Sequence, residues 1–197
     1  LAVMPHHVDA LVNKGVALAE LASLDAALAS FDLALDHAPD NLRAWMGRAL
    51  SLTALKRFDD AIATFDRVLT LHPGHAEAHF SRGRALRDAG RQREAIDSYD
   101  RALAGKPDYA EALYNRGNAW LDLKENEQAL ASYDRALRAN PAMADAHYKR
   151  GNALHNLKRY AQAEAAYAEA MRIAPDHADA MWSRIGAQMQ QQKYDDA

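Results

Sequence analysis

His72, His75 and His79 are the closest group of potential metal ligands in this sequence. His75 and His79 lie four residues apart, so they share one face of a helix, and imidazole is a ligand of zinc and other transition metals. However, Pro73 and Gly74 place a turn between His72 and His75, and no carboxylate-rich segment offers further ligands. We therefore expect surface or helix-capping histidines, with no metal site and no cofactor.

Other catalytic arrangements are also missing from the sequence. It contains no cysteine, which excludes a disulfide framework and a thiolate zinc site. It contains no glycine loop that would hold phosphate, no HExxH helix and no credible pairing of a nucleophile with a base. We expect no catalytic residues in this chain. A catalytic role would need residues outside it.

Landmark residues recur every 34 residues without an insertion. They form a glycine series (Gly15, Gly83, Gly117, Gly151, with Ala49 and Ile185 at the two remaining steps), an aromatic series (Phe31, Phe65, Tyr99, Tyr133, Tyr167) and a proline series (Pro39, Pro73, Pro107, Pro141, Pro175). A fixed period of this length is typical of a solenoid, in which one small structural unit is repeated. Solenoids present extended binding surfaces.

Each repeat contains two stretches with apolar residues at helical spacing. In the repeat that begins at Ala110, the first stretch covers residues 110–121 and the second runs from Gln128 to Leu137. Pro141 follows the second stretch, where it no longer disrupts a helix. No segment shows the alternation typical of β-strands. We predict an all-α fold made of helical hairpins in series.

The pattern resembles the tetratricopeptide repeat (TPR) family: small residues at repeat positions 8, 20 and 27, an aromatic residue at position 24 and proline at position 32. The resemblance implies an all-α, right-handed α-solenoid of helix-turn-helix units. We expect the end of a preceding unit at residues 1–7, five complete units at 8–41, 42–75, 76–109, 110–143 and 144–177, and a partial sixth at 178–197. Tyr194 would then begin a second helix, as Phe58 does in the second repeat.

The resemblance also implies that repeat positions 2, 5, 9, 12 and 13 face a concave groove. Partner-binding candidates there are the aromatic residues of position 5 (Phe80, Tyr114, Tyr148, Trp182) and the polar residues of position 9 (Arg84, Asn118, Asn152). Aromatic side chains dominate many binding interfaces, and amides bond peptide backbones. A second interpretation is that the rings pack against the next repeat. The two interpretations do not exclude each other.

Two charge series follow the same period. Position 7 is basic (Lys14, Arg48, Arg82, Arg116, Arg150, Arg184) and position 25 is acidic (Asp32, Asp66, Asp100, Asp134). The basic series alone would suggest an anion-binding stripe, but matched periodic charges on adjacent helices favour ion pairs between them. Ala168 replaces the acid in the fifth repeat, so we expect Arg150 or Arg184 to lack this partner.

We predict a noncatalytic scaffold whose groove binds a protein or peptide. The alternative is a substrate-recruiting arm of a larger enzyme, because residues 112–119 and 146–153 are similar to the TPR arms of bacterial O-GlcNAc-transferase-like proteins. Asn115 belongs to the asparagine series of such arms, although Lys149 interrupts the series here. Neither end has the polar cap that solenoids need, so we also consider a piece of a longer array that associates with another copy through uncapped ends. No position 5 is lysine, so we do not expect the carboxylate clamp of chaperone-binding TPR proteins.

Composition excludes two further classes of partner. Lys and Arg number 24 and Asp and Glu 27, giving a net charge of −3, so no strongly basic face is available for nucleic acid. No apolar run approaches the roughly 18 residues of a membrane span. We expect a soluble, cytoplasmic protein that binds neither nucleic acid nor membrane.

Overall fold

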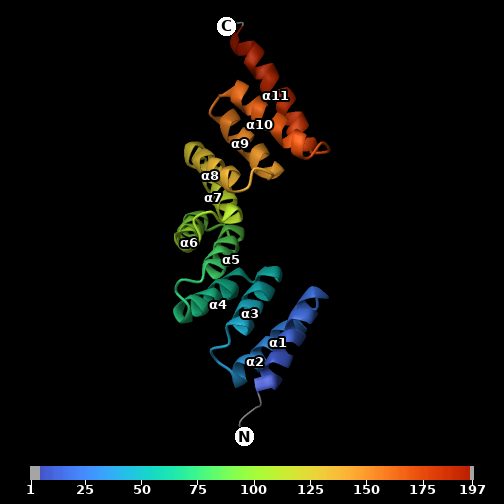
Figure 1. Ribbon diagram of the computed structural model, residues 1–197, viewed down its shortest axis with the longest axis vertical. Helices are drawn as coiled ribbons and strands as arrows, with labels where there is room; N and C mark the ends of the chain where they lie inside the picture. The colour runs from blue at the N-terminus through green and yellow to red at the C-terminus, as the bar shows by residue number, and fades with distance from the viewer. Residues whose placement is uncertain (1–4, 196–197) are drawn as a thin grey trace. The chain divides into compact units, whose positions relative to one another are not determined.

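The structure, a computed structural model, describes residues 5–195 (Figure 1). All regular elements in this range are α-helices, which confirms the all-α prediction. They are α1 (Pro5–Glu20), α2 (Leu24–His37), α3 (Leu42–Ala54), α4 (Phe58–Leu71), α5 (Ala76–Asp88), α6 (Gln92–Gly105), α7 (Ala110–Asp122), α8 (Asn126–Ala139), α9 (Ala144–Asn156), α10 (Tyr160–Ile173) and α11 (Ala178–Asp195). The second stretch predicted at residues 128–137 is α8, which extends beyond the prediction at both ends.

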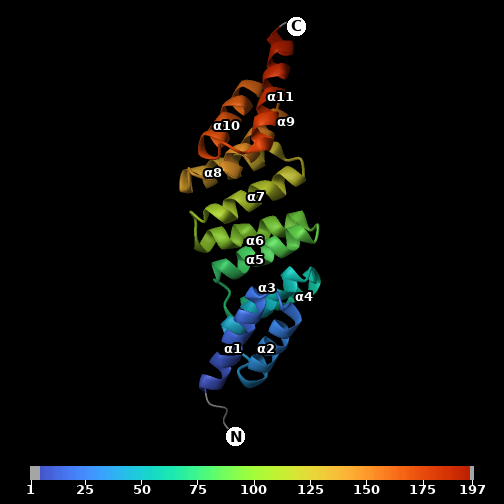
Figure 2. The ribbon, with the colours of Figure 1, turned by 90° about the vertical axis from the view of Figure 1, so that its right-hand side faces the viewer.

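The chain divides into two compact units, which we call the N-terminal unit (Leu1–Gly105, α1–α6) and the C-terminal unit (Lys106–Ala197, α7–α11). Consecutive helices pair as hairpins, as Figure 2 shows for α5 with α6 and for α9 with α10. Within each unit the second helix of one hairpin packs against the first helix of the next: α2 on α3 and α4 on α5, then α8 on α9 and α10 on α11. Each unit is therefore a stack of hairpins.

A single left-handed residue closes the turn inside every complete hairpin. The residues with positive φ are Ala22, Lys56, Gly90, Lys124 and Lys158, all at repeat position 15. In the second hairpin, Lys56 N donates to the Thr53 carbonyl (3.0 Å) and Arg57 N donates to the Leu52 carbonyl (2.9 Å). This is the Schellman pattern that ends a helix with one αL residue. It fixes the length of the turn and so keeps the period constant.

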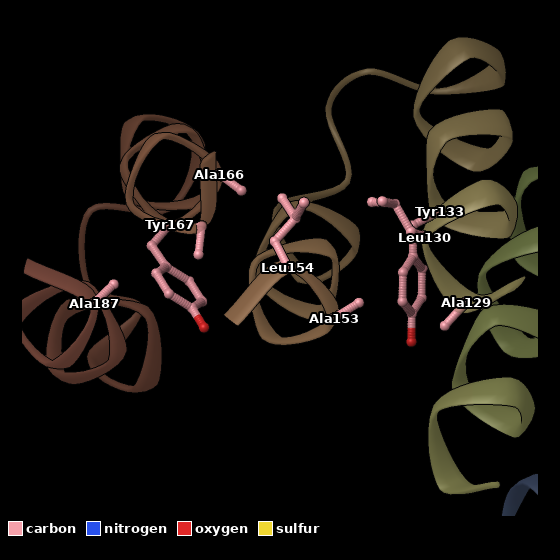
Figure 3. Packing of buried hydrophobic residues seen from close by; sticks show 9 residues of the cluster. Ala129, Leu130, Tyr133, Ala153, Leu154, Ala166, Tyr167 and Ala187 are labelled. Atoms are coloured by element: carbon pink, nitrogen blue, oxygen red, sulfur yellow. The ribbon is translucent and has the colours of Figure 1, made fainter. Parts of the chain in front are cut away.

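The aromatic residue of position 24 fills the space that the small residue of position 8 leaves open. A Cβ atom added at Gly117 would lie 2.5 Å from Cε1 of Tyr133, and one added at Gly15 or Gly83 would lie 2.6 Å from the ring of its own repeat. Tyr133 and Tyr167 are fully or almost fully buried in the core of the C-terminal unit. Figure 3 shows Tyr167 with Leu154 on one side and Ala187 on the other. In the repeats with glycine at position 8 the ring therefore occupies the space of the missing side chain, whereas in the second repeat Ala49 takes this position beside the buried Phe65.

Repeat position 34 caps the first helix of the next hairpin. Asn41 Oδ1 accepts from Ala44 N (3.0 Å), His75 Nδ1 accepts from Ala78 N (3.1 Å), and His177 Nδ1 accepts from Ala180 N (3.3 Å). An N-cap side chain satisfies one of the free amides at a helix start. The capping interpretation of His75 is confirmed.

Repeat position 4 ties that helix to the preceding turn through a ring N–H group. Trp45 Nε1 donates to the Pro39 carbonyl (2.7 Å), and His79 Nε2 lies 2.8 Å from the Pro73 carbonyl. His147 Nε2 repeats the contact at 3.0 Å from Pro141. Because a carbonyl only accepts, the neutral His79 ring carries its proton on Nε2.

One expectation about the last helix is wrong. A second helix was expected to begin at Tyr194, but α11 continues without a turn through Asp195. Position 15 is Gln192 here, and no residue described in α11 has the positive φ that closes the turn in the other hairpins, so the helix continues. At the other end, Pro5–His7 form the start of α1, and residues 1–4 of the predicted preceding repeat lie outside the described residues.

Substitution of two helical glycines tests the ring-filled space. Gly117→Ala adds a Cβ atom that collides with Tyr133, whereas Gly186→Ala in α11 meets no atom within 4 Å. Overpacking costs about 1–3 kcal/mol, and replacing glycine by alanine in a helix gains about 1 kcal/mol. We expect Gly117→Ala to lower the midpoint of urea unfolding and Gly186→Ala to raise it. The same direction of change in both variants would contradict this packing.

Because His79 is buried, we predict that the N-terminal unit loses stability at acidic pH. Burial, with smaller contributions from Arg101 and Arg82, lowers the pKa of His79 below its usual value of 6.5. A depressed histidine pKa means that the unfolded chain binds the proton more tightly, so His79 destabilises the fold as pH falls below about 6.5. We expect His79→Leu, which copies Leu113 at the same repeat position, to show less loss of unfolding free energy between pH 7.5 and 5.5.

The matched control for this measurement is His147→Leu, which makes the same change of shape at the same repeat position. An identical pH dependence of unfolding in wild type and His79→Leu would refute the role assigned to His79.

Candidate functional site

Two aromatic candidates of the C-terminal unit, Tyr114 and Tyr148, each pack on a buried ring and remain partly accessible. The Tyr114 ring lies 6.0 Å from the Tyr133 ring at 49°, and the Tyr148 ring lies 5.9 Å from the Tyr167 ring at 44°. Both candidate rings are half-buried, whereas Trp182 is 69% exposed. Tyr114 and Tyr148 thus combine the two interpretations, because each packs on the buried ring of its own hairpin and still reaches the surface.

The asparagines of position 9 stand one helical turn after these rings and bond the buried tyrosines. The hydroxyl of Tyr133 donates to Asn118 Oδ1 (2.8 Å), and the hydroxyl of Tyr167 donates to Asn152 Oδ1 (2.9 Å). Burial raises the pKa of the Tyr167 hydroxyl well above its usual value, so this group stays a neutral donor. The bonds hold the amide carbonyls and leave the Nδ2 groups of Asn118 and Asn152 without a partner among the described residues.

Tyr148 has two further neighbours. The His177 ring lies 4.8 Å from it, and Lys149 Nζ lies 5.4 Å from its ring centre. A cation above an aromatic face is attracted by the ring's negative quadrupole. The position of Tyr148 is therefore set from three sides, by Tyr167 as well as by these two residues.

Asn115 lies on α7 next to Tyr114 in sequence, but its side chain bonds its own helix. Asn115 Nδ2 donates to the Glu111 carbonyl at 2.7 Å. The structure therefore brings Tyr114 and Asn118 together as a pair one turn apart and holds the Asn115 amide against the backbone.

Phe80 and Arg84 form the equivalent pair in the N-terminal unit. The Phe80 ring lies 6.1 Å from the Tyr99 ring at 45°, and the Arg84 guanidinium carbon lies 5.9 Å from the Phe80 ring centre. Here no asparagine occupies position 9, and the buried Tyr99 hydroxyl has no hydrogen-bond partner in the described part of the chain. The packing of the position 5 ring on a buried tyrosine thus recurs in these three repeats. The hydrogen bond of the buried tyrosine hydroxyl depends on the residue at position 9.

The basic series of position 7 is paired with acids of the preceding repeat. The distances from Arg Nε to Asp Oδ1 are 2.7 Å for Arg48 with Asp32, 2.7 Å for Arg82 with Asp66 and 2.6 Å for Arg150 with Asp134. These bonds confirm the predicted ion pairs and occupy the side chains that an anion stripe would need.

Where the acid is missing, a different carboxylate replaces it. The residue that would pair with Arg184 in the series is Ala168, and Arg184 bonds Glu164 instead (Nη2 to Oε1, 3.2 Å). Gln188 Nε2 donates to the same Oε1 atom at 2.6 Å. Of the two arginines expected to lack the aspartate, Arg150 keeps it and Arg184 does not.

The sequence interpretation missed an apolar pocket in the N-terminal unit. It has a volume of about 310 Å³, and Val16, Phe31 and Leu50 are among its lining residues. The signal for it is visible in the sequence: position 6 of the second repeat is Gly47, where the other repeats have polar residues, and position 9 is Val16 and Leu50 in the first two repeats, where the next three have Arg or Asn.

Two classes of site are absent from residues 5–195. No three His, Cys, Asp or Glu side chains described there are grouped as metal ligands would be. None of the helices described there combines the length and the apolar character that crossing a membrane requires.

Comparisons with known proteins give the same fold. The crystal structure of MamA superposes with a TM-score of 0.79 at 21% sequence identity, covering 89% of this chain and 96% of that one. The crystal structure of YrrB, described as a TPR protein with an unusual peptide-binding site, has a TM-score of 0.75 at 21% identity and covers 88% and 90%. PilF of Pseudomonas aeruginosa has a TM-score of 0.75 at 18% identity and covers 96% and 92%. At these identities the likeness concerns the fold alone.

No curated protein matches the sequence. A family model of the tetratricopeptide repeat matches residues 1–41, 14–76, 48–110, 80–136 and 114–178, and so extends over most of the sequence. With the hairpins, the αL turns and the ring-filled glycine spaces, this match shows that the chain belongs to the tetratricopeptide repeat family.

Proposed function

We propose that the chain is a noncatalytic interaction scaffold and that one face of the C-terminal unit binds an extended segment of a partner protein. We call this face the Tyr–Asn face and define it by Tyr114, Asn118, Tyr148, Asn152 and Trp182. In the N-terminal unit we propose the aromatic–cationic pair of Phe80 and Arg84 as a separate partner contact. Asn115 follows Tyr114 on α7.

The observation that carries the proposal is the repeated pairing of a partly exposed ring with an amide that has unused donors. On α7 and on α9 the ring and the asparagine are four residues apart, so they lie on the same side of the helix. Each ring offers apolar contact area at low entropic cost, and each Nδ2 group can donate to a peptide carbonyl. A peptide backbone supplies such carbonyls at regular intervals.

The buried tyrosine hydroxyls orient the asparagine side chains of this face in the free protein. Tyr133 and Tyr167 hold the Oδ1 atoms of Asn118 and Asn152, which orients the Nδ2 groups outward from the bond. Side chains held in a binding geometry lose less entropy on association. YrrB, which has a similar fold, is described as having a peptide-binding site, and this supports peptide recognition as a use of the fold.

Removing two rings of the Tyr–Asn face tests the proposal. We expect Tyr114→Ala/Tyr148→Ala to lose the partner that wild type recovers in a pull-down from the source cells, identified by mass spectrometry. Truncation of a central interface aromatic costs about 2 kcal/mol or more, so affinity should fall at least about 30-fold. The matched control is Tyr109→Ala/Tyr160→Ala, which removes two tyrosines of the same unit outside this face.

Thermal melts followed by circular dichroism establish that both double variants are folded. Equal recovery of the partner by a folded Tyr114→Ala/Tyr148→Ala variant would eliminate the Tyr–Asn face as the main contact.

Self-association is a second candidate, favoured by the exposed apolar side chains of α11. Met181, Trp182, Ile185 and Met189 are all exposed on this helix. Apolar side chains that cluster on a surface mark interaction sites in soluble proteins. We expect light scattering after size exclusion to give a mass that rises with protein concentration, and Ile185→Gln/Met189→Gln to abolish the rise. A constant monomer mass would exclude this candidate.

A substrate-recruiting arm of a glycosyltransferase is a third candidate, and it rests on the similarity of residues 112–119 and 146–153 to such arms. Two observations weigh against a continuous series of asparagines. Asn115 bonds the Glu111 carbonyl of its own helix, and the equivalent residue of the next repeat is Lys149. The coding sequence decides the question: a nucleotide-sugar-binding domain in the same reading frame would support this role, and its absence would exclude it.

A further inference from the structure

The apolar pocket of the N-terminal unit lies between α1 and α3 over a ring of α2. Val16 and Ala19 of α1 and Leu50 and Ala54 of α3 line it together with Phe31. Val16 is 38% exposed and Leu50 is 47% exposed. Ligand pockets in proteins span about 300–1,000 Å³, so a volume of about 310 Å³ suits one large side chain and not a whole folded element.

Gly47 opens this pocket. A Cβ atom at this position would collide with the Phe31 ring, so the absence of a side chain lets this buried ring form the floor of the pocket. The other repeats have polar residues at the same repeat position: Asn13, Ser81, Asn115, Lys149 and Ser183. The pocket is therefore a particular feature of the first two repeats and not a general property of the hairpin stack.

The pocket offers an occupant almost no hydrogen-bonding group. The Ser51 hydroxyl lines it but already donates to the Gly47 carbonyl at 2.9 Å. Position 9, which is asparagine or arginine in the next three repeats, is valine and leucine here. Burying an unpaired polar group is costly, so the part of the occupant that enters must be apolar.

The one charged residue that lines the pocket is Glu20. Its side chain is exposed and pairs with no basic group among the described residues. A carboxylate at the edge of an apolar pocket favours a basic residue beside the buried group of an occupant, because complementary charges select a partner and its orientation.

We propose that this pocket binds a peptide segment in which a large apolar side chain, such as Phe, Leu or Met, is followed by Lys or Arg. The apolar side chain lies between the exposed Val16 and Leu50, above the buried Phe31 ring, and the basic group lies near Glu20. The inference stands apart from the Tyr–Asn face, since all of its residues belong to the N-terminal unit.

Three synthetic peptides on a Gly-Ser framework test the proposal, with Phe-Lys, Ala-Lys or Phe-Glu at the centre. Binding is measured by fluorescence polarisation and by shifts of the Val16 and Leu50 methyl resonances. We expect the Phe-Lys peptide to bind and shift these methyls, and the Ala-Lys peptide to bind about tenfold or more weakly, since it buries no ring. The Phe-Glu peptide should bind several-fold more weakly than Phe-Lys.

Variants assign the site. Val16→Asn/Leu50→Asn introduces the residue that Asn118 and Asn152 already place at this repeat position, so the fold accommodates it. We expect it to abolish binding of the Phe-Lys peptide. Leu33→Asn is the matched control, because Leu33 is similarly exposed (43%) but does not line the pocket, and it should leave binding unchanged. Glu20→Lys should reverse the preference between the Phe-Lys and Phe-Glu peptides.

Several outcomes would overturn the inference. These are no binding of the Phe-Lys peptide, equal binding of all three peptides, or unchanged binding in a folded Val16→Asn/Leu50→Asn variant. A rise of mass with concentration that Val16→Asn/Leu50→Asn abolishes, without peptide binding, would assign the pocket to a second copy of the chain instead.

Discussion

The structure depends on a close contact between an aromatic ring on the second helix of a hairpin and a missing side chain on the first. At Gly117 and Tyr133 the ring lies where a Cβ atom would be, so the two backbones approach closely and the ring is fully buried. Because interiors are densely packed, this contact fixes the spacing of the two helices. The same ring then supports Tyr114 and bonds Asn118, so the packing of the hairpin also positions the surface that we propose for binding.

Contacts between hairpins use the regularly spaced charges of positions 7 and 25. Arg48, Arg82 and Arg150 at position 7 bond an aspartate of the preceding repeat, and Arg48 and Arg82 also donate to Thr64 and Ser98 of their own repeat. Pairs of this kind add little stability each when exposed, but their regular spacing keeps neighbouring hairpins in register. Half-buried rings, amide donors and one apolar pocket are then the features available to a partner.

The sequence predicted the repeated elements well because each depends on local residue types at a fixed spacing. The glycine and aromatic series, the proline that follows each second helix, and the charge pairs all appear where the period places them. Departures of single residues from the repeat pattern were harder to predict. The bond from Asn115 to its own helix and the choice of Glu164 by Arg184 depend on side-chain geometry. The pocket over Phe31 arises from a combination of Gly47 with apolar neighbours, which becomes informative only when the repeats are compared position by position.

A double-mutant cycle on the last complete hairpin tests the central contact most directly. The free energy of unfolding would be measured for Gly151→Ala in wild type and in a Tyr167→Leu background, where the ring that occupies the space is gone. The account predicts that Gly151→Ala destabilises the wild-type protein and stabilises the Tyr167→Leu variant by about 1 kcal/mol, the helix propensity gain alone. The same effect in both backgrounds would show that ring and glycine act independently, and would contradict the account.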